Sequence, residues 1–93
     1  MFQTGLVSVT FRQKSVKEVT DLAARAGLTA IEWGGDIHVP HGDTQTAAIT
    51  GRLCRDAGIQ AASYGSYYRL GTPGVDFAEV LRTAIALGAP VIR

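Results

Sequence analysis

The sequence predicts an α/β protein in which strands and helices alternate and the strands form a parallel sheet. Three predicted helices each end at a glycine, Gly27, Gly58 or Gly88, and a short apolar stretch follows each glycine. The glycines are about 30 residues apart, which is the size of one strand-plus-helix unit. No short hairpin signal interrupts this order, and crossovers of this length join parallel strands.

The first unit combines a short strand with a well-marked helix. Alternating side chains over residues 6–11 predict a strand that ends at Phe11. Ser15 and Glu18 have the spacing of a capping box, in which each side chain bonds the backbone of the other residue. Apolar residues then recur at helical spacing up to Gly27, where a glycine fits the left-handed turn that ends many helices.

The second unit begins with a strand over residues 30–34 and a long loop over residues 35–43. Asp43 or Thr44 is expected to cap the next helix, because both side chains accept hydrogen bonds from backbone amides at a helix start. That helix should end at Gly58. Its expected buried face consists of Ala48, Ile49, Leu53, Cys54 and Ala57.

The third unit has a strand over residues 60–65, a tyrosine-rich loop over residues 66–74, and a helix from a cap at Asp76 to Gly88. The expected buried face of this helix consists of Phe77, Val80, Leu81, Ala84 and Ile85. A fourth strand has only begun at residues 91–93 where the sequence stops. We therefore expect one domain, residues 1–93, that is truncated in its fourth strand.

Two architectures are built from such units, the eight-fold TIM barrel and the open doubly wound sheet. The predicted helix-to-strand joints are short and featureless, whereas the strand-to-helix loops are long and contain both histidines, Tyr67, Tyr68 and several polar groups. A barrel builds its site from all the loops at the carboxyl ends of its strands, and an open sheet builds it at one switch point. Eight units would also give roughly 250 residues, the usual barrel length. The barrel is the favoured prediction.

Composition limits the classes of partner and compartment. The chain has 93 residues, 46% of them hydrophobic, and a formal net charge of +1. This balance gives no electrostatic reason to expect nucleic acid or a membrane surface as a partner. A single cysteine, Cys54, forms no internal disulfide, which is typical of a reducing compartment. Without a signal-like start or a membrane span, the expected location is the cytoplasm.

Two charged residues occupy equivalent positions in different strands. Glu32 is the fifth residue after Gly27, and Arg93 is the fifth residue after Gly88. Alternate strands of a barrel contribute side chains to the same interior layer, so the second and fourth strands would bring these two residues together. We expect an ionised pair, because each charge offsets the desolvation of the other. The expected role is structural, and a role in substrate binding is the alternative.

The loop after the second strand contains residue types that hold metals, Asp36, His38, His41 and Asp43. Their spacing lacks the fixed geometry of two histidines one helical turn apart. Asp43 suits a helix cap, and Asp36 beside two glycines suits a turn. No metal site is therefore expected from these residues. His38 is predicted to be a neutral hydrogen-bonding group in a pocket wall, and His41 to be exposed without a role.

Four aromatic residues, Trp33, Tyr64, Tyr67 and Tyr68, lie at or just beyond predicted strand ends. Rings with polar tips at such positions are suited to the wall of a small-molecule pocket, although some of them would instead close the core. Side chains alternate along a strand, so Trp33 points away from Glu32. It either reaches the pocket through a bend at the following glycines or packs under a helix.

Two stretches, IEWGGDIHVP at residues 31–40 and ASYGSYYRLG at residues 62–71, resemble the sugar phosphate isomerase/epimerase family. That family belongs to the xylose isomerase-like TIM barrels, which also include apurinic endonucleases of the endonuclease IV type. The resemblance covers the whole chain in order. It implies that the chain is the (βα)3β portion, the N-terminal part, of a (β/α)8 barrel.

The resemblance also implies an activity, the isomerisation or epimerisation of a sugar or sugar phosphate with a divalent metal, manganese, magnesium or zinc. In the family, the metal ligands and catalytic glutamates come from strands five to eight, which lie outside these residues. We therefore expect no catalytic residue and no bound metal here, and the chain alone should be inactive. The implied contribution is a substrate-facing wall made of Phe11, Trp33, His38, Ser63, Tyr64, Tyr67 and Tyr68.

Two other functions stay open at this point. The chain could be a small, non-catalytic α/β binding module, or a fragment of an endonuclease IV-like repair enzyme, which the near-zero charge disfavours. A sheet of three and a half units leaves strand edges unpaired and one face uncovered. This predicts self-association of the chain or pairing with the missing half of the barrel.

Overall fold

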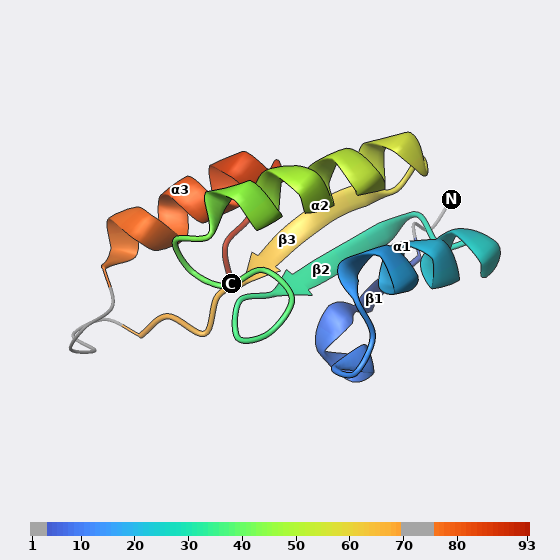
Figure 1. Ribbon diagram of the computed structural model, residues 1–93, viewed down its shortest axis with the longest axis horizontal. Coiled ribbons are helices and arrows are strands. Elements are labelled where there is room, and N and C mark those ends of the chain that lie inside the picture. Colours follow the sequence, from blue (N-terminus) through green and yellow to red (C-terminus); the bar gives the residue numbers. More distant parts are fainter. Residues whose placement is uncertain (1–3, 70–75) are drawn as a thin grey trace.

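The computed structural model describes residues 4–69 and 76–93 and shows an α/β fold with a three-stranded parallel sheet (Figure 1). The elements, in order, are β1 (Gly5–Val7), the 3₁₀ turn η1 (Ser8–Phe11), α1 (Val16–Arg25), β2 (Ala30–Gly34), α2 (Thr44–Asp56), β3 (Gln60–Gly65) and α3 (Phe77–Leu87). The predicted alternation of strands and helices is confirmed. Part of the predicted tyrosine-rich loop, residues 70–74, lies outside the described residues.

The strands lie side by side in chain order, β1-β2-β3. An irregularity after Ile31 shifts the register of the β2–β3 pair, so that Glu32 lies opposite Ser63. Residues 91–93 continue the series on the free side of β3. There the Tyr64 amide donates to the Val91 carbonyl at 2.8 Å, and the Arg93 amide donates to the Tyr64 carbonyl at 2.9 Å.

The core lies between the sheet and the helices. It includes Ile31, Trp33 and Tyr64 from the sheet, together with residues from all three α-helices. Because strand side chains alternate, Glu32 and Ser63 belong to the other face of the sheet. The sheet thus has one apolar, helix-covered face and one face with polar groups near its carboxyl end.

The predicted helix ends are confirmed. Ser15 and Glu18 form the reciprocal capping box of α1. Asp43 caps α2 by accepting from the Thr46 amide, and Asp76 caps α3 in the same manner. All three glycines that follow the helices have positive φ, between 72° and 83°. These caps satisfy backbone groups that a helix end leaves without partners.

The predicted first strand was wrong in its second half. Strand β1 ends at Val7, and the chain turns into η1, with Ser8 fully buried. The Ser8 hydroxyl accepts a hydrogen bond from the Gly34 amide at 2.8 Å. This side-chain acceptor takes the place that a backbone carbonyl would have in a longer strand ladder, so it ends the pairing of β1 with β2.

The predicted buried face of α2 was wrong in most positions. Ala48, Ile49 and Ala57 are exposed and Leu53 is half-buried, so only Cys54 of the predicted set is buried. The buried residues are Ala47, Thr50, Gly51 and Cys54. Figure 1 shows α2 and α3 running side by side, and small residues on α2 allow that close approach. The buried face is therefore set by two neighbours, the sheet and α3.

Three of the five residues predicted to be buried on α3 are exposed instead. Phe77, Leu81 and Ile85, here called the α3 stripe, follow one another at four-residue spacing, and Ile85 is 69% exposed. Val80 and Ala84 are buried as predicted, together with Thr83 and Leu87. Helical spacing marked this side as apolar, but in the described part of the chain no element covers it.

No helix among residues 4–69 and 76–93 combines the length and the apolar run that crossing a membrane requires.

Candidate functional site

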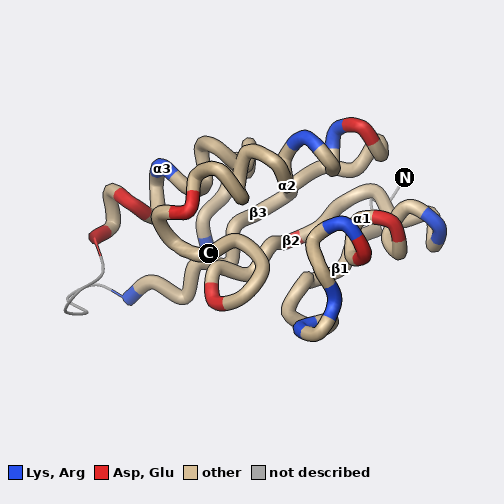
Figure 2. The backbone as a smooth tube through the Cα atoms, in the orientation of Figure 1, with Lys and Arg blue, Asp and Glu red and all other residues tan. Residues whose placement is uncertain are grey.

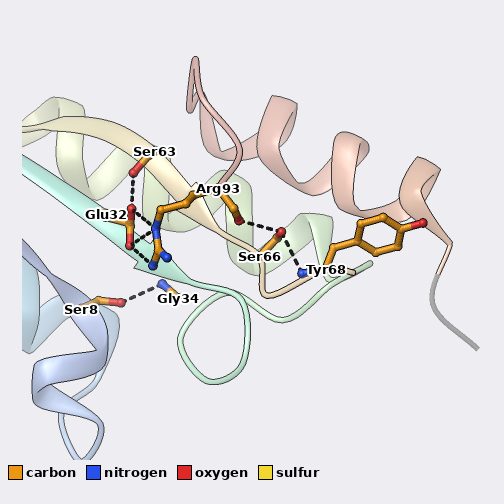
Figure 3. A network of polar contacts seen from close by, with 7 residues as sticks. All are labelled: Ser8, Glu32, Gly34, Ser63, Ser66, Tyr68 and Arg93. Atoms are coloured by element: carbon orange, nitrogen blue, oxygen red, sulfur yellow. Dashed lines mark hydrogen bonds and ion pairs between the residues drawn. The ribbon is translucent and has the colours of Figure 1, made fainter. Parts of the chain in front are cut away.

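A polar cluster lies on the face of the sheet opposite the helices, around Glu32 in the middle of β2 and Ser63 in the second half of β3. Glu32 is the only charged residue in the three strands, and Figure 2 shows how the other charges are spread over helices and loops. Arg93 donates to both carboxylate oxygens of Glu32, from Nε at 3.0 Å and from Nη2 at 2.7 Å. The Ser63 hydroxyl donates to the same carboxylate at 2.7 Å. Figure 3 shows these side chains pointing toward one another.

The ion pair joins β2 to residue 93, which lies on the other side of β3. Gly65 makes room for it, because a Cβ atom at that position would lie 3.1 Å from Glu32 Oε2 and 3.4 Å from Arg93 Nη2. The two partners differ in solvent access, since the side chain of Glu32 is 16% exposed and that of Arg93 is 61% exposed. The carboxylate is therefore fixed in the protein, while the guanidinium reaches the surface.

Hydrogen bonds from Arg93 hold the pKa of Glu32 below its usual value, and the Ser63 hydroxyl adds to this effect, while partial burial opposes it. The same pair raises the pKa of Arg93. Both groups are thus ionised at neutral pH. Because Glu32 and Arg93 offset each other's charge, the cluster carries no net charge.

We predict that this pair makes the stability depend on acid pH. The folded-state pKa of Glu32 lies below its unfolded-state value, so the ionised pair stabilises the fold above about pH 4.3. That stabilisation is lost as the pH falls through the folded-state pKa. Urea midpoints of the wild type and Glu32→Gln should differ at pH 6, and the difference should shrink as the pH is lowered toward 3.

The comparison with Glu32→Gln is needed because Glu18 and Asp43 also have lowered pKa values, from hydrogen bonds at their helix caps. Asp21→Asn, which removes an exposed ion pair with Lys17, is a suitable control with little effect at either pH. A difference between wild type and Glu32→Gln that stays constant from pH 6 to pH 3 would contradict the prediction.

Trp33 and Tyr64 have no exposed surface. Trp33 packs under α2, where its indole Nε1 donates to Cys54 Sγ at 3.3 Å. Of the two placements considered for Trp33, the structure thus shows the one beneath a helix. The Tyr64 hydroxyl donates to the Val39 carbonyl at 2.6 Å, and burial raises its pKa. Both side chains belong to the core in this structure and present no surface to a ligand.

His38 is buried between two fixed partners. Its Nε2 lies 2.8 Å from the Lys14 carbonyl and its Nδ1 lies 3.1 Å from the Ser8 hydroxyl. Since a carbonyl only accepts, Nε2 donates to Lys14, and the Ser8 hydroxyl is the partner of Nδ1. His38 therefore connects the loop after β2 to the turn before α1.

His41 was expected to be exposed without a role, and this expectation was wrong. It is half-buried, its Nε2 donates to the Ser66 carbonyl at 2.5 Å, and its ring meets the ring of Tyr64 edge-on. The Ser66 hydroxyl in turn donates to the Arg93 carbonyl at 3.0 Å and accepts from the Tyr68 amide. These contacts tie the loops after β2 and β3 to residue 93, and Figure 3 shows the bonds of Ser66 with Arg93 and Tyr68.

Three other residues were predicted to belong to the site, Tyr67, Tyr68 and Phe11, and of these Tyr67 lies next to Arg93 of the polar cluster. Tyr67 is 50% exposed, and its ring centroid lies 5.9 Å from the Arg93 guanidinium carbon. Tyr68 is half-buried and contacts the ring of Phe77. Phe11 lies in η1 and lines a hollow of about 460 Å³ with residues 9–14 and Glu18, among which it is the only predicted site residue.

Sequence analysis did not single out Ser8 and Ser66. Ser8 hydrogen-bonds Gly34 and His38 at the loop after β2, and Ser66 hydrogen-bonds Tyr68 and Arg93 in the loop after β3. Ser8 fits the polar side of the alternation over residues 6–11, so the sequence carried no signal for its buried role. The metal-ligand types in the loop also stay apart, since Asp36 pairs with Arg12 and Asp43 caps α2. Among the described residues, no group of three or more His, Cys, Asp or Glu side chains could hold a metal ion.

No protein-family model matches this chain, and no curated protein matches it either. The resemblance described above therefore depends on the motifs at residues 31–40 and 62–71.

Proposed function

We propose that this chain supplies the N-terminal, substrate-facing part of a TIM barrel enzyme of the sugar phosphate isomerase/epimerase type. The observation that carries the proposal is the strand order. The parallel strands follow chain order, and residues 91–93 extend the series beside β3. A barrel adds its strands in this sequence, whereas a doubly wound sheet reverses direction at a switch point.

The position of the polar cluster supports the same proposal. Glu32, the central residue of β2, and Ser63, in the second half of β3, lie with Arg93 on the face that a closed barrel would turn inward. The loop that follows β3 reaches this cluster through Tyr67, and barrel enzymes build their sites from such loops. In the proposed enzyme the chain binds and orients the sugar.

The divalent metal that the family uses does not fit the residues in hand, because the described side chains offer no group of ligands for it. Accordingly, we assign no metal-dependent step to this chain. Its own contribution is hydrogen bonding to the substrate and exclusion of water.

A chimera tests the proposal directly. Residues 1–93 would replace the corresponding N-terminal units of an active sugar isomerase barrel, and the product would be assayed with aldoses, ketoses and their phosphates in the presence of manganese, magnesium or zinc. We expect isomerase or epimerase activity from the chimera and none from the 93-residue chain alone. A matched chimera that carries three unrelated β/α units is the control. A folded but inactive chimera would contradict the proposal.

We also propose that the isolated chain associates with itself. The α3 stripe and Val91 expose apolar surface beside the open edge of the sheet, and burying it between copies is favourable by about 25 cal/mol per Å². Light scattering should show a dimer or larger species at high micromolar concentration. Leu81→Lys with Ile85→Lys should shift the chain to a monomer, while Ala78→Lys, on an exposed position of the same helix, should not. A wild-type monomer at that concentration would contradict this prediction.

A further inference from the structure

One side chain in the polar cluster is both exposed and held in place. Arg93 is fixed by hydrogen bonds from its Nε and Nη2 to Glu32, and these use one edge of its planar guanidinium. The remaining N–H groups lie outside the ion pair, on a side chain that is 61% exposed. An arginine held in this way loses little conformational freedom when it donates to a ligand.

The charge of the cluster restricts what such a ligand is. Glu32 neutralises Arg93, so an anion approaching the guanidinium also meets the carboxylate. Phosphate oxygens only accept hydrogen bonds at the guanidinium and are repelled by Glu32. Hydroxyl groups both donate and accept. A pair of adjacent hydroxyls can therefore accept from Arg93 with one oxygen and donate to Glu32 with the other.

The same guanidinium lies over one face of an aromatic ring, that of Tyr67. Tyr67 is half exposed, with its ring centroid 5.9 Å from the guanidinium carbon of Arg93. Its backbone has φ of 59°, the only positive value among the non-glycine residues of the described chain. This uncommon conformation places a flat apolar surface next to the polar edge. The C–H faces of a polyol are suited to pack on such a ring.

We propose that Glu32, Arg93 and Tyr67 form a binding surface for the vicinal hydroxyls of a neutral polyol or sugar. This rests on the proposed function and refines it: these residues contact the hydroxyl-bearing carbons of the substrate, and any phosphate group is bound elsewhere. It also assigns the Glu32–Arg93 pair a binding role in addition to its structural one.

Amide chemical shifts of the 93-residue chain provide the test. We expect xylitol to shift the signals of Gly34, Gly65 and Tyr67 with millimolar affinity. The matched ligand 1,5-pentanediol has the same carbon count but no vicinal hydroxyls, and it should bind at least about tenfold more weakly, the loss expected when a charge-assisted hydrogen bond is missing. Inorganic phosphate should leave the three signals unchanged.

Substitutions test which side chains bind xylitol. Arg93→Lys keeps the charge but loses the planar fork, and should weaken xylitol binding about tenfold. Tyr67→Leu changes an exposed side chain, so the fold should persist while binding weakens by a factor of about three to ten. Lys17→Met, on the exposed face of α1, is the control and should leave the affinity unchanged.

The inference is overturned if xylitol shifts no signals at this cluster, if both variants bind it like the wild type, or if phosphate proves to be the ligand of Arg93. The xylitol-binding experiment and the chimera assay test different proposals. Xylitol binding with an inactive chimera would contradict only the proposed enzyme function. An active chimera without xylitol binding would contradict only the polyol surface.

Discussion

Replacing Trp33 with alanine is expected to lower the free energy of unfolding by about 3–5 kcal/mol, the usual cost of removing a large buried aromatic side chain. Trp33 has 0% exposure and is the largest fully buried side chain. Its loss leaves a cavity between β2 and α2 and removes the hydrogen bond to Cys54. Domains of this size are stable by only about 5–15 kcal/mol, so a substantial fraction of the variant should be unfolded.

Urea unfolding followed by circular dichroism measures this change, because Trp33 is the only tryptophan and the variant lacks its fluorescence. Trp33→Phe is the matched control, since it keeps an aromatic ring in the core. The decrease in the free energy of unfolding should be clearly smaller for Trp33→Phe than for Trp33→Ala. A cost below about 1 kcal/mol for Trp33→Ala, the level of an ordinary surface change, would contradict the buried position.

Gly51→Ala is expected to destabilise the protein by about 1–3 kcal/mol, the range for overpacking a well-packed core. A loss of stability is unusual for this substitution, because alanine normally stabilises a helix interior relative to glycine by roughly 1 kcal/mol. Here a Cβ atom would lie 2.5 Å from the Leu87 carbonyl oxygen and 3.2 Å from its carbonyl carbon. These backbone atoms belong to the end of α3, so α2 and α3 would have to separate.

Ala48→Gly provides the comparison within the same helix. Ala48 is exposed, so removing its methyl group should cost roughly 0.5–1 kcal/mol through helix propensity alone. Thermal or urea unfolding should therefore rank alanine above glycine at position 48 and below glycine at position 51. A more stable Gly51→Ala variant would mean that the two helices are not in close contact at this point.

The positions of the elements could be predicted because their signals are local. The capping box at Ser15 and Glu18, the caps at Asp43 and Asp76, and the glycines after the helices each act through hydrogen bonds or backbone angles within a few residues. The second and third strands were predicted with the bounds that the structure shows. Equivalent spacing after Gly27 and Gly88 also placed Glu32 and Arg93 at matching strand positions, and the structure brings them into contact.

Other features could not be predicted, because they depend on neighbours far away in sequence. Residues 6–11 alternate like a strand, yet the Ser8 hydroxyl takes the Gly34 amide and ends the ladder at Val7. The loop roles of His41 and Ser66 likewise arise only where the loops after β2 and β3 meet.

Helix faces show most clearly what sequence and tertiary structure each decided. The spacing of apolar residues by itself determined that α2 and α3 are amphipathic helices between parallel strands. Only the packing decided that Gly51 and Thr50 are buried on α2, while Ile49 and the α3 stripe are exposed. The physical reason is that hydrophobicity favours burial of any apolar side, whereas close contact between helices selects the side whose small residues let the backbones approach.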